Sequence, residues 1–244
     1  MRLNKYIGGS GFCSRREADK LIDAGRVKIN GLLAEKGTLL KTGDKVYIDD
    51  ELISSNISKV YIAYNKPRGI TSTTDERDST NMISHINHNE RIFPIGRLDK
   101  YSEGLILLTN DGDIVNKILR STNNHEKEYL VRVDKEITKE FLQKMKKGVH
   151  ILNTVTRPCK ISKINSHVFK IILKQGLNRQ IRRMCETLNY KVFKLKRIRI
   201  MNITLGDLPK GDWRNLTQEE IKRLQLSLLD SQNSPEYKGN IKNG

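Results

Sequence analysis

The stretch IGRLDKYSEGLILLTNDG, at residues 95–112, decides how the chain is organised. In its first half Arg97 stands two positions before Asp99, and in an extended segment these two side chains share a face. Its second half is the apolar run at residues 105–109, followed by Asn-Asp-Gly, which predicts a buried strand that ends in a turn. The pattern therefore predicts a carboxylate held on a rigid element, in a chain that is otherwise strongly basic.

The composition favours a polyanionic partner. The chain has 244 residues, with 45 lysines and arginines against 28 aspartates and glutamates, so its formal net charge is +17. A charge of this size points first to nucleic acid, although many ribosome-associated proteins are basic throughout. Hydrophobic residues make up 36% of the chain and charged residues 30%, which fits a polar globular protein with one core and a small second domain.

The cysteines and the N-terminus indicate a reducing compartment. The three cysteines, Cys13, Cys159 and Cys185, are odd in number and far apart, which argues against a disulfide framework and a structural zinc site. The N-terminal residues lack the apolar core of a signal peptide, and no apolar run is long enough to span a bilayer. We therefore expect a cytoplasmic protein.

Residues 1–50 are predicted to form a small module of two helices and a few short strands. Apolar residues at helical spacing begin near Leu3, and the capping-box pattern Ser14-Arg-Arg-Glu17 predicts the start of a second helix. Short strands are expected near residues 26–30 and 46–48. The module has a set of basic residues suited to phosphate contact, namely Arg2, Lys5, Arg15, Arg16, Lys20, Arg26 and Lys28.

The rest of the chain is predicted to be a linker, a larger domain and a tail. Residues 51–59 are polar and are expected to be the linker, and residues 60–229 form the larger domain. Residues 230–244 are polar and contain Pro and Gly, so we expect a disordered tail. Strands are predicted at residues 126–133 and 168–173 from their alternation. Residues 192–200 alternate apolar and basic residues, which suits an exposed strand or an RNA-facing edge.

Several kinds of nucleic-acid chemistry lack their residues in this chain. Residues 158–162, PCKIS, lack the second cysteine of a zinc deaminase, and no glycine-rich dinucleotide turn or Walker A motif is complete. The remaining candidate for catalysis is a carboxylate accompanied by arginines. Chemistry on a base generally requires the base to leave the stack, and an ionised carboxylate can then act as nucleophile or base. Arginines such as Arg97 and Arg182 could pair with Asp99, and Tyr129 could stack on the base.

Two regions resemble known families. Residues 2–7, 14–19 and 25–31 resemble the S4 RNA-binding domain, and residues 96–112 resemble the catalytic motif of the RsuA branch of the pseudouridine synthases. The resemblance extends to three further segments, YNKP at 64–67, KEY at 127–129 and GLNRQIRRM at 176–184. It implies an α+β chain in which a small S4-like domain precedes a synthase domain, whose mixed, mainly antiparallel sheet is flanked by helices.

The resemblance also implies roles for individual residues. Asp99 maps to the family's catalytic carboxylate, Tyr129 to the tyrosine that stacks on the uracil, and Arg182 to the basic residue that pairs with the carboxylate. Ile181 maps to an apolar residue of the uracil pocket. Arg97 is expected to help hold the extruded nucleotide, Arg179 to bind RNA, and Arg183 to contact RNA or the core.

The implied reaction is the isomerisation of uridine to pseudouridine, without a metal or a cofactor. Residues 124–129 and 196–202 are most similar to a subgroup that modifies large-subunit (23S) ribosomal RNA, so we expect that RNA or its assembly intermediate as partner, with a monomeric enzyme. Asp99 could attack C1′ or assist loss of a ribose proton, and the sequence leaves both routes open. The alternative is a non-catalytic RNA-binding or ribosome-assembly protein that keeps the fold.

Overall fold

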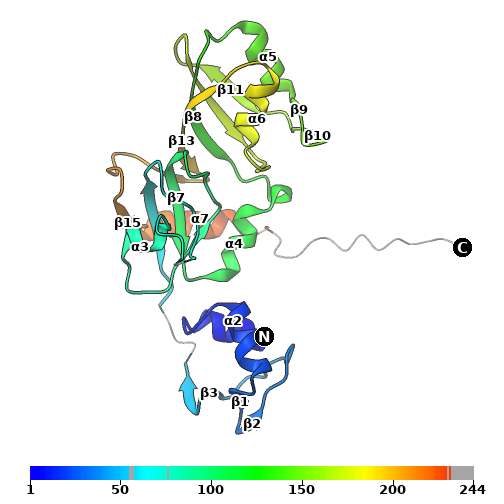
Figure 1. Cartoon of the computed structure of the whole chain (residues 1–244), viewed down its shortest axis with the longest axis vertical. Helices are drawn as coiled ribbons and strands as arrows, with labels where there is room; N and C mark the ends of the chain where they lie inside the picture. The colour runs from blue at the N-terminus through cyan, green and yellow to red at the C-terminus, as the bar shows by residue number, and fades with distance from the viewer. Residues whose placement is uncertain (55–57, 76, 230, 232–244) are drawn as a thin grey trace, which may run out of the picture. The chain divides into compact units, whose positions relative to one another are not determined.

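The computed structural model describes residues 1–54, 58–75, 77–229 and 231, and it divides into two compact units (Figure 1). The first unit comprises Met1–Val60 together with the short segments His88–Ile92 and Asn110–Gly112. The second contains Tyr61–Asn87, Phe93–Thr109 and the chain from Asp113 onward. Among the helices of the described residues, none is both long and apolar enough to cross a membrane.

The first unit packs two helices on a four-stranded sheet. As predicted, Ser14 forms a capping box with Glu17 at the start of the second helix. The strand order is β2-β1-β3-β4, and all pairs are antiparallel. The elements are α1 (Leu3–Gly9), α2 (Arg15–Asp23), β1 (Val27–Ile29), β2 (Leu32–Leu33), β3 (Val46–Ile48) and β4 (Glu51–Ile53). The core consists of Leu3, Ile7, Ala18, Ile22, Val27, Val46, Ile48 and Ile53.

The linker prediction was wrong at its start. Residues Glu51–Ile53 form β4, which pairs with β3, and Ile53 is buried in the core of the first unit. The polar character of the segment hid a strand with only one inward side chain. Residues 55–57 of the predicted linker lie outside the described residues, as do residue 230 and residues 232–244 of the predicted tail.

The second unit is built on a nine-stranded sheet that is mixed and mainly antiparallel, as expected. The main path is β11-β12-β8-β13-β7-β5-β15, while β14 pairs with β13 and β6 pairs with β7. The β13–β7 pair is parallel, and the other pairs are antiparallel. The strands are β5 (Tyr61–Lys66), β6 (Phe93–Ile95), β7 (Glu103–Thr109), β8 (Lys127–Val133), β11 (Lys160–Lys163), β12 (Val168–Leu173), β13 (Val192–Ile200), β14 (Ile203–Thr204) and β15 (Trp213–Asn215). A separate hairpin pairs β9 (His150–Ile151) with β10 (Thr154–Val155).

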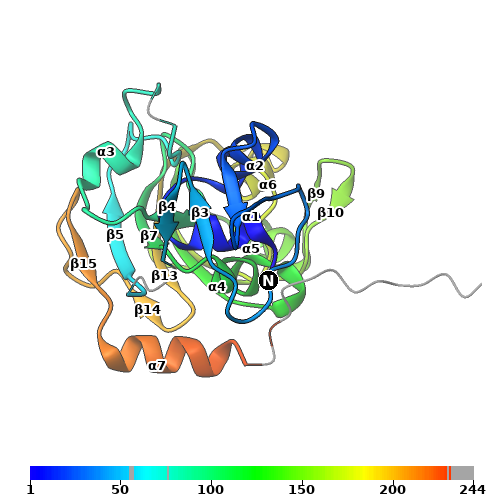
Figure 2. The same ribbon diagram turned by 90° about the horizontal axis from the view of Figure 1, so that it is seen from below.

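Helices pack on both halves of this sheet. Phe141 of α5 packs edge-on against Phe169 of β12, with ring centroids 5.5 Å apart, and α6 buries Ile181, Met184 and Cys185. At the other half, Ile118 of α4 and Leu224 of α7 join the core formed by β5 and β7 (Figures 1 and 2). The helices are α3 (Met82–Ile86), α4 (Gly112–Leu119), α5 (Lys139–Lys147), α6 (Gln180–Thr187) and α7 (Gln218–Ser227), and the short 3₁₀ turn is η1 (Ser121–Asn123).

Two predictions about the sheet need correction. Strand β13 lies between β8 and β7 and is therefore internal to the sheet, whereas the sequence suggested an exposed strand or an edge. Asp99 lies in the loop between β6 and β7, so it is not held on a strand. Gly96, with φ +77°, ends the extended backbone after Ile95, which explains why Arg97 and Asp99 do not continue β6.

The two halves of the sheet meet where β13 runs parallel to β7, through the pairs Lys196 with Glu103 and Arg197 with Gly104. Gly104 has φ +101°, and a Cβ at this position would lie 2.3 Å from the carbonyl oxygen of Arg197. Both the backbone conformation and the available space therefore require glycine here.

We expect Gly104→Ala to lower the free energy of unfolding by about 3 kcal/mol, because β7 and β13 must move apart to admit the methyl group. The matched control is Gly211→Ala, since Gly211 has φ +91° and nothing within 4 Å of an added Cβ. This control carries only the backbone strain of a positive φ, about 1 kcal/mol. Urea unfolding measures both, and equal losses in the two variants would show that β7 and β13 are not tightly apposed.

Candidate active site

A small recess of about 90 Å³ opens in the second unit, between the β6–β7 loop and the start of α6. Its walls come from segments far apart in the sequence, which the sheet brings together. The lining residues are Arg97, Leu98, Asp99, Ser102, Tyr129, Leu173, Gln175, Gly176, Leu177, Arg179, Gln180, Ile181 and Leu195. Asp99, Tyr129 and Ile181, which the sequence singled out, all line this recess.

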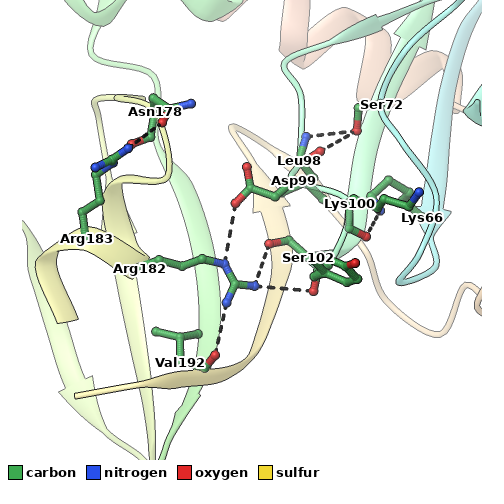
Figure 3. Close-up of polar contacts among 11 residues, drawn as sticks. Lys66, Ser72, Leu98, Asp99, Lys100, Ser102, Asn178, Arg182, Arg183 and Val192 are labelled. Carbon is green, nitrogen blue, oxygen red and sulfur yellow. Dashed lines mark hydrogen bonds and ion pairs between the residues drawn. The ribbon is translucent and has the colours of Figure 1, made fainter. Parts of the chain in front are cut away.

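Asp99 forms an ion pair with Arg182, as expected from the resemblance (Figure 3). The Oδ2 atom of Asp99 lies 3.6 Å from Nε of Arg182, and the side chains are 31% and 11% exposed respectively. Arg182 also donates to the carbonyl of Val192 at 3.1 Å and to Oγ of Ser102 at 3.2 Å. Burial lowers the pKa of Arg182, and the nearby carboxylate of Asp99 is the largest influence that raises it. The guanidinium is thus fixed by several acceptors and presents its Nε side to Asp99.

The backbone on either side of Asp99 is held by hydrogen bonds. Leu98 donates its N–H to Oγ of Ser72 at 3.2 Å and accepts a hydrogen bond from the same hydroxyl at 2.8 Å. Ser102 donates its N–H to the carbonyl of Asp99 at 2.9 Å. These bonds give a loop the rigidity that the sequence predicted for a strand.

Lys66 supports this loop from inside the protein. Its side chain is fully buried, and Nζ donates to the carbonyls of Pro67 and Ile70 at 2.8 and 2.7 Å and to that of Lys100 at 3.4 Å. Desolvation lowers the pKa of Lys66 to about 8, while Glu103 and Asp99 raise it. The ammonium therefore ties the segment after β5 to the residue that follows Asp99.

Arg197 holds the other side of the loop. It is almost fully buried in β13, and it donates from Nε to the carbonyl of Leu105 at 2.7 Å and from Nη2 to that of Gly96 at 3.3 Å. Lys127, on the buried face of β8, lies near this guanidinium. Desolvation, followed by repulsion from Arg197, lowers the pKa of Lys127 to about 8.

Tyr129 and Ile181 form the apolar side of the recess. Tyr129 lies on the buried face of β8, opposite Ile171 of β12 and Arg197 of β13 in register, and its side chain is 9% exposed. Ile181 is in the first turn of α6 and is also buried. A planar base that entered the recess would meet the Tyr129 ring and the Ile181 side chain, with Asp99 at the polar end.

The other predicted binding residues are dispersed. Arg97 and Arg179 are exposed and line the recess, whereas Arg183 turns back to the carbonyl of Asn178 at 3.1 Å and is absent from the lining (Figure 3). Arg2, Arg15, Arg16 and Lys20 are exposed in the first unit, and Lys5 is half-buried there. Arg26 is paired with Asp49 and Lys28 with Asp50, so these two cations are already neutralised by neighbours.

The comparisons with known proteins agree with this geometry. A family model described as RNA pseudouridylate synthase matches residues 60–187, and one described as S4 domain matches residues 1–46. The chain belongs to the RNA pseudouridine synthases. It is therefore an enzyme that isomerises uridine to pseudouridine in RNA.

Relatives of the synthase include the dual-specificity RNA pseudouridine synthase RluF of Escherichia coli, 54% identical, with 99% of this chain and 83% of the relative covered. Ribosomal large subunit pseudouridine synthase B of Bacillus subtilis is 35% identical, with coverages of 92% and 95%. A crystal structure of a pseudouridylate synthase superposes with a TM-score of 0.69 at 29% identity, covering 92% of this chain and 99% of that one.

Sequence reasoning missed several residues that build the synthase site. Ser102 accepts a hydrogen bond from Arg182, and Gln175 and Gln180 line the recess. Ser102 and Gln180 lie inside the two motifs that the sequence analysis singled out, so their position in those motifs was the available signal. Lys66 and Arg197 also lie inside segments that carry the resemblance, at residues 64–67 and 196–202, but their burial was not predicted because a lysine or arginine in a strand is ordinarily solvated.

We expect Lys127→Met to stabilise the synthase by roughly 2 kcal/mol near pH 7, because it removes a desolvated cation beside Arg197. The folded-state pKa of about 8 lies below the unfolded value of 10.5. The penalty is thus complete below pH 8 and is relieved as the pH rises from 8 to 10.5. The gain should shrink over that window.

The measurement is urea unfolding of the variant and the parent at pH 7 and pH 10. Lys139→Met, at an exposed position, is the control and should show no such pH dependence. A gain for Lys127→Met that is equal at both pH values would contradict the account of a desolvated ammonium.

Proposed function

We propose that the synthase acts on large-subunit ribosomal RNA, or on its assembly intermediate, and that Asp99, Tyr129 and Arg182 carry the reaction. The observation behind the proposal is the Asp99–Arg182 ion pair at the polar end of a recess whose apolar side is Tyr129 and Ile181. The names of the relatives support the choice of RNA, since one of them is a large-subunit enzyme.

Asp99 is the reacting group in this proposal. The base must leave the helical stack to enter a recess of this size. The N1–C1′ bond then breaks, the uracil rotates, and C5 bonds to C1′ while the C5 proton is lost and N1 gains a proton. The two routes for Asp99, attack at C1′ and removal of a ribose proton, both require an ionised carboxylate beside the ribose. The reaction is an isomerisation without net redox change, so the proposal assigns no metal and no cofactor.

Arg182 serves Asp99 in two ways. Its positive charge attracts the carboxylate and offsets the repulsion between that carboxylate and the phosphates of the RNA. Its hydrogen bonds to Val192 and Ser102 fix the guanidinium, so the carboxylate is oriented before substrate arrives. A lysine could supply the positive charge, but its flexible side chain would not orient the carboxylate as the fixed guanidinium does.

Tyr129 and Ile181 hold the uracil while it is detached. Stacking on an aromatic ring stabilises an extruded base by about 1–3 kcal/mol, and the buried position of Tyr129 keeps its ring in one orientation. We assign to Tyr129 the further role of taking the proton from C5. Arg97 and Arg179 are exposed at the rim, and we assign them to the phosphates on either side of the target.

The S4 domain positions the RNA. The exposed cations Arg2, Arg15, Arg16 and Lys20 supply phosphate contacts, while Arg26 and Lys28 contribute less because Asp49 and Asp50 already neutralise them. We further propose that the synthase is a cytoplasmic monomer. The alternative is a non-catalytic RNA-binding or assembly protein that keeps the fold. The ion pair of Asp99 with Arg182 speaks against this alternative, since a binding surface gains nothing from a carboxylate that repels phosphate.

Asp99→Asn should retain RNA binding and lose pseudouridine formation entirely, because the amide is nearly isosteric but cannot act as nucleophile or base. Pseudouridine is scored in large-subunit ribosomal RNA by carbodiimide modification and primer extension, and binding by fluorescence anisotropy. The control is Asp207→Asn, at an exposed position outside the recess, which should keep full activity. Normal turnover by Asp99→Asn would refute the assignment, and absence of pseudouridine with the unmodified enzyme would refute the choice of RNA.

A further inference from the structure

A second hollow lies in the catalytic unit, beside the active-site recess but lined by other residues. It is a groove of about 770 Å³ where the end of α5 meets the start of β11 and the end of β12. Helix α5 packs against β11 on this side of the unit (Figure 1). The rim carries four lysines, Lys146, Lys147, Lys160 and Lys174. Between them lie Pro158, Cys159 and Ile172, which offer a largely apolar floor.

The groove is electrostatically positive. All four rim lysines are exposed, and within the described part of the chain Lys146, Lys147 and Lys174 form no salt bridge. Lys160 lies 3.8 Å from Glu126, the one acid in the lining, but that carboxylate is held more closely by Arg199, at 3.0 Å. Most of the positive charge on the rim is therefore available to a ligand.

The groove and the active-site recess share a wall. At the end of β12, Leu173 and Gln175 line the recess, while the alternating residues Ile172 and Lys174 line the groove. The backbone N–H of Arg157, next to Pro158 in the groove, donates to Oε1 of Gln175 at 3.0 Å. Ile172 and Leu173 project from opposite faces of β12, so an RNA strand reaches the groove from the recess by passing around the end of this strand.

The dipole of helix α5 accounts for only two of the four rim lysines. Lys146 and Lys147 lie in the last turn of α5, where cations complement the helix dipole. That reason does not apply to Lys160 or Lys174, which come from β11 and from the end of β12. Cys159 is not a nucleophile here, since burial raises the pKa of its thiol to about 11 and Sγ donates to the carbonyl of Met145 at 3.2 Å.

We propose that this groove binds the ribose-phosphate backbone of the RNA strand that flanks the target uridine. The inference rests on the proposed function in taking RNA as substrate. Phosphates match the lysines of the rim, and an unstacked base can lie on the apolar floor. Because the groove lies on the opposite face of β12 from the recess, its contacts hold the flanking strand on that face, away from the target. They thereby help to keep the target base extruded.

The test is the salt dependence of binding to a fluorescently labelled single-stranded oligouridine, measured by anisotropy. The variants are Lys146→Gln/Lys147→Gln on one wall and Lys160→Gln/Lys174→Gln on the other. Each pair should lower the slope of log affinity against log salt by about 1.4, since each lost contact to a single strand contributes about 0.7. The matched control is Lys139→Gln/Lys222→Gln, which removes the same charge at exposed positions outside the groove and should leave the slope unchanged.

The proposal would be overturned if both groove variants had the same salt slope as the control. It would also be overturned if only one of the two groove variants had a lowered slope. Pseudouridine formation by the unmodified enzyme is scored separately in ribosomal RNA. A lowered salt slope in the groove variants, without pseudouridine formation, would support RNA binding in the groove and refute the proposed function. Pseudouridine formation with unchanged salt slopes would support the proposed function and refute RNA binding in the groove.

Discussion

The close approach of β7 and β13 at Gly104 is the constraint on which the active site depends. Gly104 lies against the backbone of Arg197, where even a methyl group has no room. This parallel contact joins the half of the sheet built from β5, β7 and β15 to the half built from β8, β11, β12 and β13. Asp99 belongs to the first half, through the loop before β7, whereas Tyr129 and Arg182 belong to the second. The contact between β7 and β13 therefore sets the distance from the Asp99 carboxylate to Tyr129 and Arg182.

Buried cations stabilise the same region, where β7 and β13 meet. Arg197 crosses from β13 to the carbonyls of Leu105 and Gly96, and Lys66 binds the carbonyl of Pro67, after β5, and that of Lys100, after Asp99. Each cation is costly to desolvate, and desolvation lowers the pKa of Lys66 to about 8. Backbone carbonyls offset part of this cost. The result is a loop fixed by hydrogen bonds from two buried cations, which lie behind the Asp99 carboxylate. Such an environment suits a substrate that brings phosphates with it.

The sequence predicted much of this arrangement because its signals were local. The capping box at Ser14 marks a helix start, and the alternation that predicted a strand at residues 126–133 matches β8, whose buried face carries Tyr129. Strand β13 was misplaced because alternation reports which face of a strand meets solvent and carries no information on its neighbours in the sheet. Gly96 redirects the chain before Asp99 because it has a positive φ. The sequence could not predict this, since a glycine can adopt either sign of φ. The pairing of Asp99 with Arg182 came from the resemblance, since no local pattern links residues so far apart in sequence.

The central claim is that one uridine enters the recess between Asp99 and Tyr129. A crystal structure of the Asp99→Asn variant with a uridine-containing ribosomal RNA fragment tests it most directly. We expect a flipped nucleotide, with its uracil stacked on the Tyr129 ring and its C1′ atom within about 3.5 Å of the residue 99 side chain. A bound RNA whose uridines all remain stacked, with the recess empty, would contradict it.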